Sequence, residues 1–140
     1  MELDFLIQNW YLILTLVIIL ALLLLEPYLL KLSGINSVGP LGVTQLVNHE
    51  SAVVLDVCTA KEFSAAHIPD AMSVPVSEIA TLSDKINRYK DKPVIISCRS
   101  GSRAKGAAKK FVKMGFKKIY ILSGGNAAWQ KENLPMTRNK

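Results

Sequence analysis

A stretch of 21 residues without a charge, from Phe5 to Leu25, most constrains what this chain can fold into. Its second half is almost pure Leu, Ile and Val. At about 1.5 Å per residue, a helix of this length matches the ~30 Å hydrocarbon core of a bilayer. A helix packed on a globular domain would be amphipathic, whereas this one is apolar on all faces. The stretch therefore predicts a transmembrane helix.

A cleaved secretory signal is the alternative interpretation of this stretch. Such signals have a basic segment before the apolar core and small residues at a cleavage site. Here the preceding residues include Glu2 and Asp4 but no Lys or Arg, and residues 26–31 offer no small-x-small site. These flanks favour a retained anchor.

The distribution of basic residues predicts the orientation of that anchor. All 17 Lys and Arg residues lie at or after Lys31, against eight acidic residues in 32–140. The positive-inside rule then places the part after the helix in the cytoplasm. We expect a single-pass protein of the cell (inner) membrane, in contact with lipid through residues 5–25.

The net charge of +6 has two interpretations. It either forms a solvated lysine surface or attracts anionic substrates and anionic lipid head groups. A nucleic-acid partner is not expected, because a basic stripe with interleaved aromatic residues is missing.

The remainder of the chain predicts one α/β domain. Roughly 105 residues suffice for a compact core. Apolar runs typical of strands alternate with helical patterns, which implies a mostly parallel sheet covered on both faces. The expected division is a tail at 1–4, the transmembrane helix at 5–25, a linker at 26–36 and the domain at 37–140.

An extended piece is expected to end at residues 37–40, and Thr44 is expected to open a short helix. Thr59 with Glu62 predicts a capping box at the start of a helix over 60–65. A later helical pattern has one apolar face, formed by Ala104, Ala107, Ala108 and Phe111.

Cys98 is the residue with the clearest chemical role. It ends the apolar run 93–97 and opens a short loop that leads into a helical pattern. Backbone N–H groups of such a loop can form an anion-binding nest, and the helix start adds partial positive charge. The thiolate is the reactive form of cysteine, and this setting favours it. The loop consists of Arg99, Ser100, Gly101, Ser102 and Arg103.

A second cysteine, Cys58, follows the expected strand 52–57. In parallel sheets ligands bind beyond the C-terminal ends of the strands, which is where both cysteines are expected to lie. Two cysteines are too few for a zinc site, and His49 and His67 show no ligand spacing with them. No metal and no other cofactor is expected.

Four local patterns occur in a characteristic order. They are Leu55-Asp56-Val57 before Glu62-Phe63, His67-Ile68-Pro69 followed by Ala71, the Cys98 to Arg103 loop, and Leu122-Ser123-Gly124-Gly125 with Ala128-Trp129. Together they resemble the rhodanese family of single-domain sulfurtransferases over about residues 37–135. The resemblance implies a five-stranded parallel sheet with helices on both faces. It also implies that Cys98 carries a persulfide during turnover.

The expected reaction moves a sulfane sulfur from thiosulfate, polysulfide or a persulfide donor to a thiol, a protein thiol included, or to cyanide. The loop N–H groups are expected to stabilise the thiolate and the persulfide, while Arg99 and Arg103 orient an anionic donor. Asp56 and His67 are expected to support the surrounding loops. Cys58 either packs at its strand end, or acts as a second thiol that resolves the persulfide or forms a regulatory disulfide.

Two rival functions remain open at this stage. One is a non-catalytic, membrane-tethered binding module that has kept the fold, against which the intact Cys98 loop argues. The other is a phosphatase or arsenate reductase with the same kind of loop. Phosphatase loops place their arginine one position later than Arg103, at the position that Ala104 occupies here. The tighter loop suits one sulfur atom better than a tetrahedral oxyanion.

Overall fold

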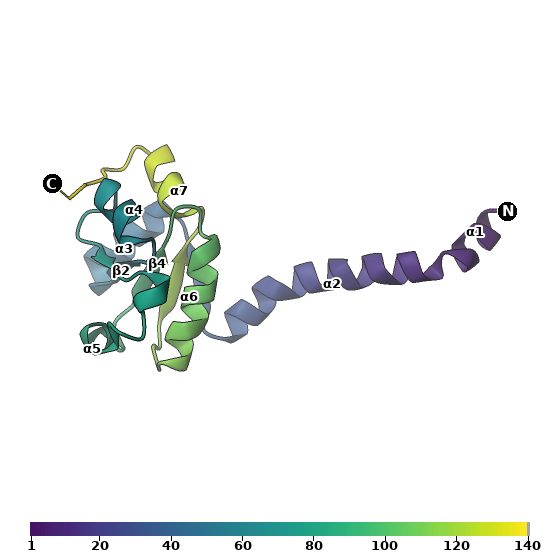
Figure 1. Ribbon diagram of the computed structural model, residues 1–140, viewed down its shortest axis with the longest axis horizontal. Helices are drawn as coiled ribbons and strands as arrows, with labels where there is room; N and C mark the ends of the chain where they lie inside the picture. The colour runs from purple at the N-terminus through teal and green to yellow at the C-terminus, as the bar shows by residue number, and fades with distance from the viewer. Residues whose placement is uncertain (140) are drawn as a thin grey trace. The chain divides into compact units, whose positions relative to one another are not determined.

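The computed structural model describes residues 1–139 and divides into two compact units, Met1–Ser33 and the remainder from Gly34 on (Figure 1). The first unit contains α1 (Glu2–Gln8) and α2 (Trp10–Leu32). By length and composition, α2 is apolar enough to cross a membrane, and none of its residues is buried in protein.

The long helix lies further along the chain than the expected 5–25. It starts only at Trp10 because Asn9 leaves helical geometry, and the Asn9 side chain donates to the Phe5 carbonyl oxygen at 2.8 Å. It continues through Glu26 and Pro27, since an exposed proline can interrupt one helical hydrogen bond without ending the helix. The expected linker 26–36 is therefore reduced to residues 33–34.

The second unit holds a five-stranded sheet in the order β1-β5-β4-β2-β3, with every neighbouring pair parallel. This confirms the predicted fold class. The expected last residue of the domain, Lys140, lies outside the described residues. The elements are β1 (Ile35–Val38), α3 (Pro40–Glu50), β2 (Val53–Asp56), α4 (Ala60–Ala65), β3 (Met72–Ser73), η1 (Val76–Glu78), α5 (Ser83–Ile86), η2 (Asn87–Tyr89), β4 (Val94–Ser97), α6 (Ser102–Lys113), β5 (Ile119–Leu122) and α7 (Gly125–Lys131).

Side chains alternate between the two faces of the sheet and build a core on each. On one face, Val54, Ile95 and Leu122 pack with Val43 of α3 and Trp129 of α7. On the other face, α6 packs against β4 and β5. The buried side of α6 carries the residues that the helical pattern predicted, Ala104, Ala107, Ala108 and Phe111.

Local sequence signals account for where two of the helices begin. Thr59 and Glu62 form the predicted capping box of α4: the Glu62 N–H donates to Thr59 Oγ1 at 3.2 Å, and the Thr59 N–H donates to Glu62 Oε2 at 2.9 Å. Helix α3 begins at Pro40 rather than at Thr44, because proline is favoured in the first helical turn.

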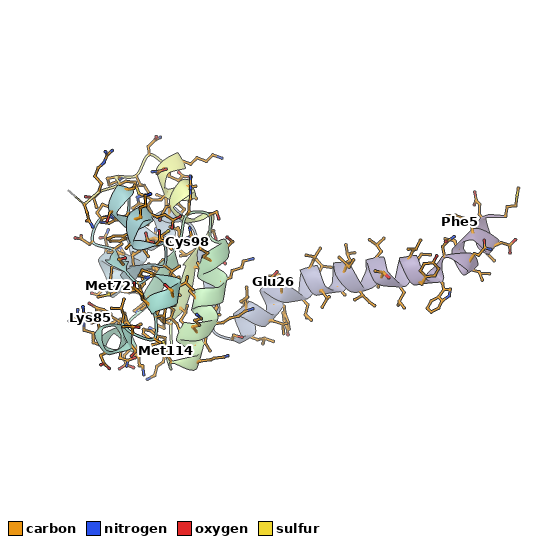
Figure 2. The ribbon with its side chains drawn as sticks, in the orientation of Figure 1. Phe5, Glu26, Met72, Lys85, Cys98 and Met114 are labelled. Atoms are coloured by element: carbon orange, nitrogen blue, oxygen red, sulfur yellow. The ribbon has the colours of Figure 1, made fainter. Side chains whose placement is uncertain are left out.

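Because all strands run in the same direction, the sheet has two distinct edges. At the carboxyl edge, where the strands end, Asp56 of β2 pairs in register with Ser97 of β4. Cys58 and Cys98 follow these two residues. At the amino edge, where the strands begin, Ile35 of β1 pairs with Ile119 of β5. In Figure 2, Cys98 and Met114 lie toward opposite ends of α6.

Candidate active site

Cys98 lies directly after β4, in the loop that leads into α6. Its Sγ accepts a hydrogen bond of 2.9 Å from the Gly101 N–H, and its side chain has no exposed surface. Gly101 has a φ of +98°, a backbone conformation that L side chains rarely adopt. The glycine therefore permits the turn that aims its N–H at the sulfur, as the predicted anion nest requires.

The start of α7 fixes this loop from the other side. The Asn126 N–H donates to the Cys98 carbonyl oxygen at 2.7 Å, and the Ala127 N–H donates to the Arg99 carbonyl oxygen at 3.1 Å. A Cβ atom on Gly125 would overlap the backbone of Cys98, Arg99 and Gly101. The glycine pair that turns β5 into α7 thus allows two segments to approach closely enough to exchange hydrogen bonds.

Arg103 points toward Glu62 of α4. Its Nη1 donates to Glu62 Oε2 at 2.8 Å, and its Nη2 donates to Oε1 at 3.1 Å. Hydrogen bonds from Arg103 and from the Thr59 backbone lower the pKa of Glu62 to about 2, and the hydrogen bonds to Glu62 raise the pKa of Arg103. In this structure the Arg103 guanidinium is bound to this carboxylate, and the role expected of Arg103 in orienting a donor anion stays a prediction.

Cys58 lies beside the same guanidinium, with Arg103 Nη2 at 3.8 Å from its Sγ. Its side chain is buried. Burial first, and then a hydrogen bond to the Asp56 carboxylate, raise the pKa of Cys58 to about 12. A thiol that stays protonated at neutral pH is a weak nucleophile. The geometry therefore favours packing, one of the two expected roles of Cys58, over attack on a persulfide.

The carboxylate of Asp56 links the end of β2 to the start of α7. It is fully buried, and its carboxylate accepts the Cys58 N–H at 2.9 Å and Asn126 Nδ2 at 3.2 Å. The expected supporting role of Asp56 matches this geometry. Asn126 Oδ1 is buried and has no hydrogen-bond partner among residues 1–139. Asn126 therefore supplies the cleft wall with a hydrogen-bond acceptor that has no partner within residues 1–139.

His67 supports a neighbouring loop rather than the cleft. Its ring stacks on Phe63 with a centroid distance of 3.7 Å, and Nδ1 lies 2.7 Å from the Phe63 carbonyl oxygen. Its backbone forms a two-way bridge with Thr137, each hydrogen bond being 2.8 Å long. The supporting role expected of His67 stays a prediction, for which these contacts give a structural basis.

An open cleft of about 450 Å³ lies over these residues. Arg99 is exposed at the cleft, and Ser100 and Ser102 are exposed beside it, with their hydroxyl oxygens 3.3 Å apart. Cys98 is buried and does not itself line the cleft, whereas the next residue, Arg99, does. The cleft is lined by Cys58, Glu62, Arg99, Asn126, Gln130 and Met136, among others.

Sequence reasoning missed two residues of this site. Glu62 was identified only as a cap of α4. The signal that could have found it is its position: α4 directly follows β2, so a carboxylate at the start of α4 lies at the carboxyl edge of the sheet. Asn126 was overlooked because it follows the glycine pair inside a helix start. Within residues 1–139, no group of three or more His, Cys, Asp or Glu side chains gathers that could hold a metal ion.

Comparison with known proteins identifies the family of this chain. The family model of the rhodanese-like domain matches residues 42–132. The uncharacterized protein YibN of Escherichia coli K12 is 38% identical over 98 residues, which cover 69% of this chain and 68% of that protein. A sulfurtransferase of Allochromatium vinosum is 31% identical and covers 73% of this chain and 94% of its own length. The crystal structure of BH2092 from Bacillus halodurans superposes with a TM-score of 0.67 at 30% identity, covering 81% of this chain and 82% of that one. The chain belongs to the rhodanese-like domain family.

Proposed function

We propose that this protein is a sulfurtransferase in which Cys98 carries the transferred sulfur as a persulfide. The observation that carries the proposal is the hydrogen bond from the Gly101 N–H to Cys98 Sγ, at the start of α6. Relatives named sulfurtransferase or thiosulfate sulfurtransferase support it. A backbone donor and a helix N-terminus both stabilise negative charge on sulfur.

In the first half-reaction, the Cys98 thiolate attacks the sulfane sulfur of thiosulfate, polysulfide or a persulfide. A new S–S bond forms at Cys98 and the donor's bond to that sulfur breaks. With thiosulfate as the donor, sulfite leaves with the electron pair. The product is an anionic persulfide in the nest formed by the loop.

In the second half-reaction, an acceptor thiolate or cyanide attacks the outer sulfur of this persulfide. The Cys98 sulfur leaves as thiolate with the electron pair, and the acceptor becomes a persulfide or thiocyanate. The cycle is balanced without an external oxidant or reductant, and no cofactor takes part.

Arg99 is the cation that orients the donor in this scheme, because it lies at the cleft while Arg103 is bound to Glu62. A planar guanidinium suits the oxyanion end of thiosulfate. Since Cys98 has no exposed surface, the loop or the side chains above it must move before donor sulfur reaches Sγ.

The proposal includes a location. We take α2 as an anchor that crosses the cell membrane once, since none of its residues is buried in protein. The excess of Lys and Arg after α2 supports a cytoplasmic location of the domain, by the positive-inside rule.

The test is intact-mass measurement of the reduced, detergent-purified full chain after incubation with thiosulfate. The expected result is a gain of one sulfur atom, which added cyanide removes as thiocyanate. Cys98→Ser should abolish the gain, whereas Cys58→Ser, the matched control, should retain it.

Three outcomes would refute the proposal. Sulfur loading that survives Cys98→Ser would exclude the mechanism. A folded chain that gains no sulfur would favour a binding module. Turnover of an aryl phosphate without sulfur transfer would favour a phosphatase.

A further inference from the structure

The amino edge of the sheet is strongly basic. Two segments there, 84–92 and 113–118, contain seven basic residues and only the two acidic residues Asp84 and Asp91. Their net charge of five accounts for most of the +6 of the whole chain. We call this surface the basic edge; its cations are Lys85, Arg88, Lys90, Lys92, Lys113, Lys117 and Lys118.

The two segments form one continuous surface. The Lys117 N–H donates to the Lys90 carbonyl oxygen at 3.3 Å, and Lys117 Nζ lies 3.1 Å from Asp91 Oδ1. The Val94 N–H at the start of β4 donates to the Lys118 carbonyl oxygen at 2.9 Å. All the cations of the basic edge are exposed except Lys90, which is half-buried. The charge is therefore presented to the surroundings.

The chain enters the domain at this same edge. Helix α2 ends at Leu32, and β1 begins at Ile35. Ile35 pairs in register with Ile119, the residue that follows Lys118. From Leu32 to Ile35 the chain makes three residue steps, so the connection extends over roughly 10 Å at most. That span is comparable with the ~8 Å over which physiological salt screens a charge.

We propose that the basic edge contacts the anionic head groups of the bilayer in which α2 is anchored. The proposal rests on the anchoring inferred above and is independent of sulfur transfer. Lys and Arg side chains held near an anionic leaflet are attracted to it, and several of them act together. The domain would then present its carboxyl edge, with Cys98, away from the lipid.

An apolar groove adjoins the basic edge and fits the same partner. It measures about 500 Å³, and its lining includes Val76, Ile79 and Met114 together with Lys110 and Lys113. Surfaces that rest on a bilayer combine basic side chains with apolar ones, because the head-group region borders the acyl chains. The groove thus extends an amphipathic surface along α6.

An acidic protein or a nucleic acid would also be attracted to such charge. The lipid surface is favoured because only residues 33–34 separate α2 from β1, the strand that begins at this same edge of the sheet.

Amide hydrogen exchange on the full chain tests the proposal. The chain is reconstituted in vesicles of phosphatidylcholine alone and of phosphatidylcholine mixed with phosphatidylglycerol. In the anionic vesicles, we expect exchange in 84–92 and 113–118 to slow by roughly tenfold, the effect of one or two lysine contacts. High salt should reverse it. The loop 99–103 at the opposite edge is the internal reference.

Two triple variants distinguish an effect of the basic edge from an effect of the net charge of the whole chain. Replacing Lys92, Lys117 and Lys118 by Gln should abolish the slowing. Replacing Lys61, Lys131 and Arg138 by Gln removes the same charge elsewhere and should leave it intact. Equal exchange in the two kinds of vesicle would overturn the proposal, as would equal losses in the two variants. Sulfur loading of Cys98, measured on the same samples, reports separately on the proposed function.

Discussion

At the scale of single residues, the two arginines of the Cys98 loop have different environments. Arg99 is exposed at the cleft, whereas both terminal nitrogens of Arg103 donate to Glu62. The sequence presents them as equivalent, because both belong to one short loop. Their partners differ because Glu62 lies 41 positions away and reaches the loop only through the fold.

Arg99→Ala should raise the KM for thiosulfate by about tenfold or more, since a hydrogen bond to a charged group contributes about 1.5–3 kcal/mol. Unfolding free energy should change little, because Arg99 is exposed. Steady-state thiosulfate:cyanide assays and urea unfolding measure the two effects. An unchanged KM would assign donor binding to another group, and Arg99→Lys should recover part of the loss.

Cys58 should react slowly with iodoacetamide. Its pKa of about 12 leaves it protonated at pH 8, and its side chain is buried. Alkylation of the Cys98→Ser variant, followed by mass spectrometry with and without urea, isolates this thiol. We expect labelling in urea and little labelling in the folded chain. Fast labelling of the folded chain would support the alternative of Cys58 as a second reactive thiol.

At the scale of elements, the Glu62–Arg103 pair joins α4 to α6 beside the cleft that Glu62 lines. Both side chains are somewhat more than a third exposed, so solvent screening limits the pair to about 0.5–1 kcal/mol. The capping hydrogen bond of Glu62 adds to this. The pair therefore adds little to the stability of the whole domain, and its main effect is to fix α4 beside the start of α6.

Glu62→Gln should lower the unfolding free energy at pH 7 by about 1 kcal/mol. Because the folded-state pKa of Glu62 is lowered to about 2, its contribution is complete above the ordinary value of 4.5 and is lost as the pH falls to about 2. Urea midpoints across this range should converge for the two proteins. Glu78→Gln, at an exposed site, is the control, and a constant difference down to pH 2 would contradict the assignment.

Elements were predictable where local chemistry decides them. Strands β2, β4 and β5 are runs rich in β-branched residues, and the capping box of Thr59 marks the start of α4. The bounds of α2 and α3 were predicted wrongly at Pro27 and Pro40. A proline can lie inside a helix or begin one, depending on which backbone N–H groups have partners. Asn126 was not predictable, since its bond to Asp56 spans 70 positions.

At the scale of the whole molecule, the two proposed functions, sulfur transfer and lipid contact, belong to opposite edges of the sheet. Its carboxyl edge holds Cys98 and the cleft, and its amino edge receives the chain from α2 and holds the basic edge. The positive charge of the chain is evident from composition. Its concentration at one edge follows from the parallel strand order, which brings segments 84–92 and 113–118 together beside the start of β1.

The pairing of β1 with β5 has a consequence for how the protein is made. Synthesis proceeds from the N-terminus, so β1 emerges soon after α2, while its partner β5 is among the last segments to appear. Until then β1 has no partner strand and the sheet is incomplete. An apolar helix that enters the membrane during translation would be inserted before the domain folds, so that the domain would complete its folding already tethered to the bilayer.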